Sequence, residues 1–103
     1  KVYVIQSIDR KMDLNDIAEA KNLEMNELLN EIEAIVNSGT KINLDYYIDK
    51  VVDEDKQDEI FDYFQNEAES ESIEDAISAL GEGDYTEEEI RLMRIKFMSE
   101  MGN

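Results

Sequence analysis

Residues 13–37 read DLNDIAEAKNLEMNELLNEIEAIVN, and this stretch predicts the fold. Its second half places apolar side chains at the spacing that lines one face of a helix. A shorter apolar pattern precedes it, and the polar turn Lys21-Asn22-Leu23-Glu24 separates the two. Two helices joined by such a tight turn are typical of a helix-turn-helix motif. The apolar stripe of the second helix consists of Met25, Leu28, Leu29, Ile32, Ile35 and Val36.

The first helix of this motif has recognisable end signals. Asp13 suits the N-cap position, and Asp16 follows three residues later as the reciprocal acid. Asn22 tolerates the left-handed conformation in which many helices end. We therefore predict a helix over residues 14–21, with Leu23 filling the gap between the two helices of the motif.

The segments on either side of the motif complete the expected core. Residues 2–12 predict a helix in front of the motif, although the β-branched run Val2–Ile5 also suits a strand. Residues 40–44 alternate polar and apolar, so they could form one very short strand of the kind found in winged-helix domains. The sequence thus predicts an all-α or nearly all-α fold, with a winged-helix-like three-helix core within residues 1–52.

Residues 53–103 are expected to form an acidic helical extension that packs on this core to give one compact domain. Helices are predicted at 44–52, 56–65, 73–80 and 87–101, with the acidic run 53–55 as a break and 66–71 as a linker. Ser72 and Thr86 are the expected caps of the last two helices. The core stripe of the last helix is Ile90, Met93, Phe97 and Met101, while Leu92 and Ile95 lie on another side of it.

The charge is strongly negative and unevenly distributed. The chain has 10 basic and 27 acidic residues, a net charge of −17. Residues 1–50 hold 6 basic and 10 acidic residues (net −4), and residues 51–103 hold 4 and 17 (net −13). Because Lys and Arg supply most of the affinity for nucleic acid, the chain as a whole should be repelled by DNA. The acidity indicates either a solvated surface or a surface for a basic partner.

A helix-turn-helix that reads DNA places its second helix in the major groove, with phosphate contacts around it. Residues 25–37 contain no Lys or Arg, and their polar face includes Glu33 beside other acids. The last helix carries three cations within six positions, which contact either phosphates or an acidic partner, or pair with the chain's own acids. Lys1, Arg10 and Lys11 could assist. The candidate nucleic-acid or partner contacts are Lys21, Lys41, Arg91, Arg94, Lys96, Asn26 and Asn30, the last two as readers of adenine edges.

Catalytic and metal-binding motifs are missing from the sequence. Without Cys or His there is no nucleophile–imidazole arrangement and no zinc site. Gly81 and Gly83 lack the Lys-Ser/Thr of a phosphate-binding loop. A calcium loop starting at Asp53 would have Asp58 at position six and Phe64 at position twelve, which excludes it. We predict no catalytic, cofactor-binding or metal-binding residue, no small-molecule substrate and no enzymatic activity in this chain.

The apolar run Val2–Ile5 is too short for a signal peptide or a membrane span. We therefore expect a soluble, cytoplasmic protein without a membrane partner. The chain begins at Lys1 rather than at Met, which leads us to expect a piece of a larger protein.

Four stretches resemble the helix-turn-helix region at the C-terminal end of some RecQ-type ATP-dependent DNA helicases, particularly bacterial ones. They are VIQSID (4–9), DIAEAK (16–21), the helix end at 28–39 and DYTEEEIRL (84–92). The resemblance implies a parent 3′–5′ DNA helicase of repair and recombination, whose ATP-binding motor lies upstream. It also implies that this chain is a non-catalytic accessory domain that helps the parent to engage DNA.

Two further hypotheses stay open. The chain could be an acidic protein-interaction or autoregulatory module that does not bind DNA and docks on a protein partner or on the parent's own helicase core. It could also dimerise through the helix at 90–101.

Overall fold

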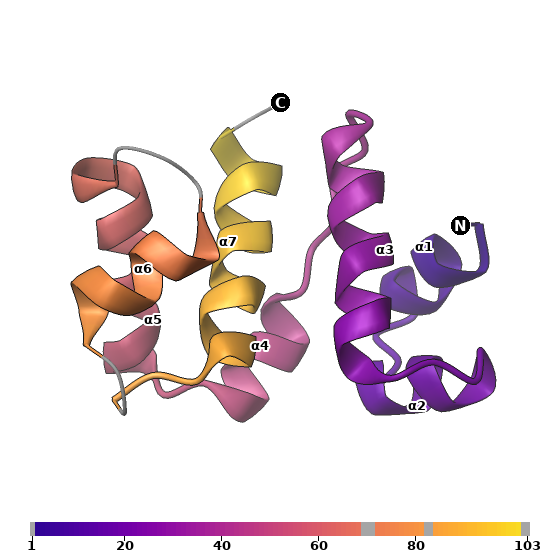
Figure 1. Ribbon diagram of the computed structural model, residues 1–103. Coiled ribbons are helices and arrows are strands. Elements are labelled where there is room, and N and C mark those ends of the chain that lie inside the picture. The colour runs from indigo at the N-terminus through magenta and orange to yellow at the C-terminus, as the bar shows by residue number, and fades with distance from the viewer. Residues whose placement is uncertain (1, 69–71, 82–83, 102–103) are drawn as a thin grey trace.

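The computed structural model describes residues 2–68, 72–81 and 84–101 of the 103-residue chain (Figure 1). Helices account for all the regular structure of these residues, which confirms the all-α prediction. The elements are α1 (Val2–Asp9), α2 (Leu14–Ala20), α3 (Met25–Asn37), α4 (Asp45–Val51), α5 (Glu54–Asp62), the π-helical turn η1 (Tyr63–Glu67), α6 (Ile73–Leu80) and α7 (Glu87–Met101).

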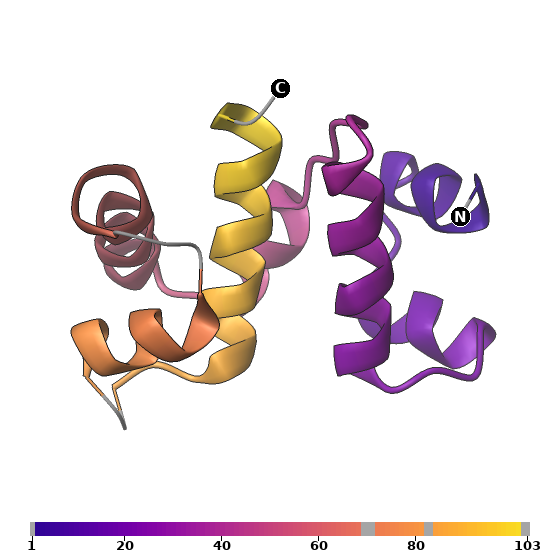
Figure 2. The ribbon, with the colours of Figure 1, turned by 45° about the horizontal axis from the view of Figure 1, so that its top comes forward.

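Helix α3 lies near the middle of the molecule. Helices α1 and α2 pack on one side of it and α7 runs along the other (Figures 1 and 2). Helices α5 and α6 lie beyond α7, and each contacts it. The helix-turn-helix formed by α2 and α3 is therefore flanked by α7, the element that brings the second half of the chain against the first.

Helices α2 and α3 begin at hydrogen-bonded caps. The Asp13 carboxylate accepts from the backbone N–H of Asn15 at 2.8 Å, which confirms Asp13 as the N-cap. Among the described residues the Asp16 side chain makes no hydrogen bond to the Asp13 N–H, so the predicted reciprocal arrangement does not form; the side-chain amide of Asn15 makes a second bond to Asp13, at 3.0 Å. The reciprocal arrangement occurs at α3, where Glu27 Oε1 accepts from the N–H of Glu24 at 2.9 Å.

The first three helices each end in a residue with left-handed backbone. These residues are Lys11 (φ 61°), Asn22 (φ 59°) and Gly39 (φ 101°). The ending at Asn22 was predicted, and the next N–H, of Leu23, donates to the carbonyl five residues earlier at 2.8 Å. The ending at Lys11 was not predicted. It stops α1 at Asp9, whereas the sequence predicted a helix through residue 12.

The short strand expected at residues 40–44 does not form. The backbone N–H of Ile42 donates to Ser99 Oγ at 2.9 Å, and the same hydroxyl donates back to the Ile42 carbonyl at 2.9 Å. Because one side chain satisfies both buried backbone groups, this segment needs no neighbouring strand. The connection between α3 and α4 is thereby fastened to α7.

The start of α5 also differs from the prediction. The acidic run 53–55 was expected to interrupt the chain, but α5 already begins at Glu54. The backbone carbonyl of Asp53 accepts from the N–H of Gln57 at 2.9 Å and closes the first turn. Acidic residues are favoured in the first turn of a helix because they face its positive end. The run therefore starts a helix instead of breaking one.

The end of α5 and the caps of the last two helices complete the second half. The predicted helix over 56–65 changes to π geometry at Tyr63, and the N–H of Ala68 donates to the Tyr63 carbonyl at 2.8 Å. Ser72 caps α6 as predicted. Thr86 and Glu89 form the predicted capping box of α7, with bonds of 2.9 and 3.1 Å. Parts of the predicted linker 66–71 and of the turn 81–84 lie outside the described residues.

Helix α7 is buried on more than one side, as the positions of Leu92 and Ile95 predicted. Ile90, Leu92, Met93 and Ile95 are each at most 1% exposed. The predicted stripe ends before Met101, which is 56% exposed at the end of the helix. The hydrophobic core extends from α1 to α7. The division into residues 1–52 and 53–103 stays a prediction.

Candidate functional site

The polar flank of α3 meets α7 through one arginine. The Arg91 guanidinium donates to Asn30 Oδ1 at 2.5 Å and to Glu33 Oε1 at 2.7 Å. Its other terminal nitrogen reaches the Asn26 carbonyl at 3.5 Å. Asn26, Asn30 and Glu33 lie at i, i+4 and i+7 of one helix, so a single planar guanidinium with several donors spans them.

Glu33 also forms an ion pair with Arg94, one turn further along α7. The three side chains are well shielded, with 12% of Glu33, 10% of Arg91 and 18% of Arg94 exposed. Burial lowers the pKa of Arg94, but a guanidinium keeps its charge at neutral pH. A buried ion pair adds little net stability. Removing one partner is destabilising, however, because it leaves the other charge buried without a partner. We call these three residues the Glu33 cluster.

Two of the predicted contact residues pair with acids at the surface. Lys21 Nζ lies 3.0 Å from Glu31 Oε1 on α3. Lys96 Nζ lies 3.0 Å from Asp45 Oδ1 on α4, with Glu100 at 4.0 Å. Together with the Glu33 cluster, these pairs give internal acidic partners to four of the predicted contact residues: Lys21, Lys96, Arg91 and Arg94. Pairing with the chain's own acids is the alternative that the sequence left open for the cations of the last helix.

The other cations divide into a paired and an unpaired group. Lys50 pairs with Asp13 and holds the pKa of that carboxyl below its ordinary value. Lys56 Nζ lies 3.6 Å from Glu89 Oε2 and 5.8 Å from the centre of the Tyr85 ring. Within the described residues, the cations that make no ion pair are Arg10, Lys11 and Lys41, and all three are exposed.

The outer ridge of α3 remains exposed but carries no cation. Adenine recognition by asparagine uses both the oxygen and the nitrogen of its amide. The amide oxygen of Asn30 is already bonded to Arg91. Asn26 contacts Arg91 only through its backbone carbonyl, so its side chain stays outside the cluster. The exposed ridge consists of Asn26, Glu27, Asn30, Ala34 and Asn37.

Sequence reasoning missed the role of Glu33, which was placed on the exposed face of the helix. Its partner Arg91 is 58 positions away, and no local pattern links the two. The cation row 91–96 was the available signal, because three cations on a helix with buried neighbours require acidic partners.

Across the described residues, no group of three or more acidic side chains is arranged to hold a metal ion. None of the described helices is long and apolar enough to cross a membrane.

The fold and the Glu33 cluster define a helix-turn-helix domain with its second helix fastened to an acidic helical extension. The family model of the RecQ-1-like, helix-turn-helix domain matches residues 1–48. This part of the chain is therefore a RecQ-type helix-turn-helix domain, as the resemblance predicted. The match ends within α4, so α5, α6 and α7 lie beyond it. No match was found among curated proteins.

Proposed function

We propose that the chain is a non-catalytic accessory module of a RecQ-type DNA helicase and that it acts through its acidic surface on a protein partner. The observation that carries this proposal is the internal pairing of the cations beside α3. Arg91 and Arg94 share Glu33, and Lys21 pairs with Glu31. The acids of α5, by contrast, remain largely exposed.

The energetics of the Glu33 cluster disfavour its use as a phosphate site. Binding a phosphate would require Arg91 or Arg94 to leave Glu33. Breaking a buried pair in this way costs about 3–5 kcal/mol, since it strands a charge. Exposed cations release counterions from DNA without that cost. The helix expected to face DNA is thus supported by cations that are already engaged.

The partner that fits this surface is a basic one. A helicase core must bind DNA and therefore carries a basic surface. In this proposal the acidic module docks on the core of its own parent, an ATP-dependent 3′–5′ helicase of repair and recombination, and competes there with DNA. The module then regulates the motor without contributing to its chemistry.

The parent enzyme provides the test. Deleting this module should raise the DNA-dependent ATPase activity of the parent at sub-saturating DNA. Adding the separate chain back should lower that activity, and added salt should relieve the effect because it screens the charges. Identical activities with and without the module, at low salt, would contradict the proposal.

A second candidate function is direct DNA engagement, favoured by the three exposed cations without ion pairs. Lys11 and Lys41 line two adjoining surface grooves that share Asp9, Asn43 and Asp45. Replacing Arg10, Lys11 and Lys41 together by Gln should weaken binding to forked DNA. The slope of log affinity against log salt should become shallower by about one for each phosphate that the variant no longer neutralises.

A further inference from the structure

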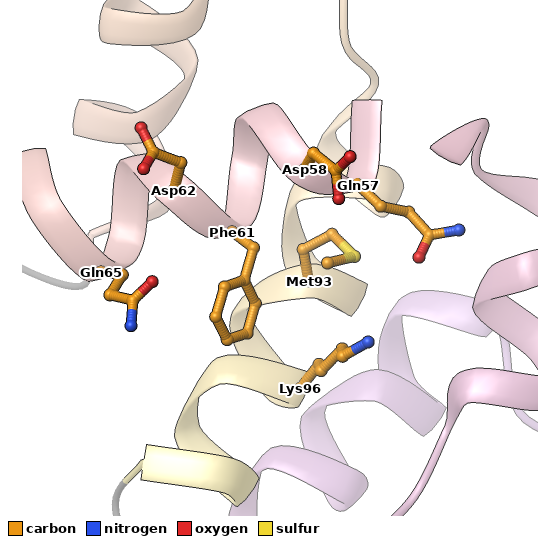
Figure 3. Close-up of a pocket in the computed structure, with 7 residues that line it drawn as sticks. All are labelled: Gln57, Asp58, Phe61, Asp62, Gln65, Met93 and Lys96. Carbon is orange, nitrogen blue, oxygen red and sulfur yellow. The ribbon is translucent and has the colours of Figure 1, made fainter. Parts of the chain in front are cut away.

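A groove of about 330 Å³ lies between α5 and α7 (Figure 3). Phe61 of α5 points into it, and Met93 and Lys96 of α7 form the facing wall. The Phe61 ring packs edge-on against Phe97, with centroids 5.7 Å apart. The groove therefore offers part of one aromatic ring to a ligand. Its size is near the lower limit for ligand sites, which suits one or two side chains of a larger partner.

The rim of this groove consists mainly of hydrogen-bond acceptors. Asp58 and Asp62 are both exposed and lie four residues apart on α5. Like charges at this spacing repel each other, so the pair is unfavourable for the helix by itself. Asn66 donates to Asp62 at 2.6 Å, which leaves the charge of the carboxylate in place.

Besides Gln65, the groove is lined by two further polar side chains, Gln57 and Lys96, whose donors are engaged. The side-chain amide nitrogen of Gln57 donates to the Val52 carbonyl at 2.9 Å and to Asp49 at 3.2 Å. What Gln57 can still offer a ligand is its amide oxygen. The Lys96 ammonium lies against Asp45, which offsets its charge. A ligand rich in donors matches this lining, whereas an anion does not.

We infer that the groove between α5 and α7 is the docking site for an arginine- or lysine-bearing segment of the basic partner. An arginine side chain carries five N–H donors and no acceptor, and its guanidinium stacks on aromatic faces. Its aliphatic stem would lie on Phe61, above the buried Met93, and its head would reach Asp58 and Asp62. This inference rests on the proposed function and assigns it a site.

A fluorescent hexa-arginine peptide is the probe for this site, titrated into the chain at about 0.1 M salt, where long-range attraction is screened. The test variant is Asp58→Asn with Asp62→Asn. Its control is Asp16→Asn with Glu19→Gln on α2. This variant also removes two negative charges from exposed side chains, but in the first half of the chain. The methyl resonance of Met93 reports on the groove itself, and those of Met12 and Met25 serve as internal references.

If the groove is the docking site, the wild-type chain should bind the peptide and the test variant should bind it about tenfold more weakly. The control should stay within about twofold of wild type. Peptide should shift the Met93 signal and leave those of Met12 and Met25 in place. Phe61→Leu, which keeps an apolar side chain but removes the ring, should also weaken binding.

Three outcomes overturn the inference. Equal losses of affinity in test and control variants would show that the peptide senses net charge alone; the proposed function would then stand without this site. A Met93 shift that depends on protein concentration without peptide would assign the groove to a second copy of the chain. Salt-sensitive DNA binding without any peptide binding would overturn both the site and the proposed function.

Discussion

The Glu33 carboxylate on α3 accepts a hydrogen bond from the Arg91 guanidinium on α7 at 2.7 Å, and both side chains are almost fully buried. This contact joins the RecQ-type helix-turn-helix to the acidic half of the chain. Buried ion pairs of this kind contribute little net stability, but a mispaired register would leave charges stranded. The Glu33 cluster therefore specifies how α7 lies against α3.

Replacing Glu33 by Gln should destabilise the fold. The substitution keeps the shape of the side chain but removes the charge that neutralises Arg91 and Arg94. We expect a loss of about 3 kcal/mol, at the low end of the range for breaking a buried pair, because the amide oxygen still accepts. In urea unfolding, this loss of stability should lower the midpoint concentration and leave the slope of free energy against urea concentration unchanged.

Glu31→Gln is the matched control for that experiment. Glu31 lies on the same helix and pairs with Lys21, but its side chain is 37% exposed. Exposed pairs contribute about 0–1 kcal/mol, so the midpoint should move little. Equal losses of stability for the two variants would show that the Glu33 cluster has no special role.

Ser99→Ala should loosen the connection between α3 and α4. Without the hydroxyl, the backbone N–H and carbonyl of the buried Ile42 have no partner from α7. Each unsatisfied buried group costs about 1–3 kcal/mol. We expect faster hydrogen exchange at the Ile42 amide together with reduced stability. Ser78→Ala on the exposed face of α6 is the control and should change neither quantity.

Lys11→Gly should stabilise the chain slightly. Lys11 has φ 61°, a conformation that costs a residue with a Cβ about 1–2 kcal/mol. Glycine removes this strain but loses about 0.5–1 kcal/mol of chain entropy, so the net gain lies between about 0 and 1.5 kcal/mol. Thermal unfolding of Lys11→Gly and Lys11→Ala separates the backbone effect from loss of the ammonium. A less stable glycine variant would contradict this account.

Tyr46 should make stability fall at alkaline pH. Its phenol donates to the Met12 carbonyl at 2.5 Å, and burial raises the pKa of Tyr46 from 10.0 to about 12. The folded state therefore holds this proton more tightly than the unfolded chain does. The resulting stabilisation is complete below about pH 10 and disappears as the pH rises through about 12.

Tyr46→Phe should reduce that alkaline loss. Urea unfolding between pH 9 and 12 should give a flatter curve for this variant than for wild type, measured as the difference between the two. Parallel curves for Tyr46→Phe and wild type would contradict the assignment.

Local signals predicted much of the fold. The stripe Leu28–Val36 and the left-handed Asn22 located the helix-turn-helix, and the capping box at Thr86 located α7. Each of these patterns acts within one or two helical turns, so the sequence displays it directly. The left-handed Lys11 was missed because lysine has no preference for that conformation.

The site depended on contacts that no local pattern encodes. Ile42 was expected in a strand because polar and apolar residues alternate in its segment. Instead, its backbone N–H donates to the hydroxyl of Ser99, 57 positions away. The cations of α7 were identified as important, but their acid, Glu33, was placed at the surface. Only the packing of α7 on α3 brings these groups together. The roles of Lys21, Lys41, Arg91, Arg94, Lys96, Asn26 and Asn30 in binding DNA or a partner stay predictions.

The most direct measurement is the affinity of this chain for labelled single-stranded, duplex and forked DNA at low salt, where any phosphate contact is strongest. With Arg91 and Arg94 held by Glu33 and a net charge of −17, the account predicts no binding to any of the three. Binding that falls steeply as salt is added would contradict it, and would show that the helix-turn-helix engages DNA directly.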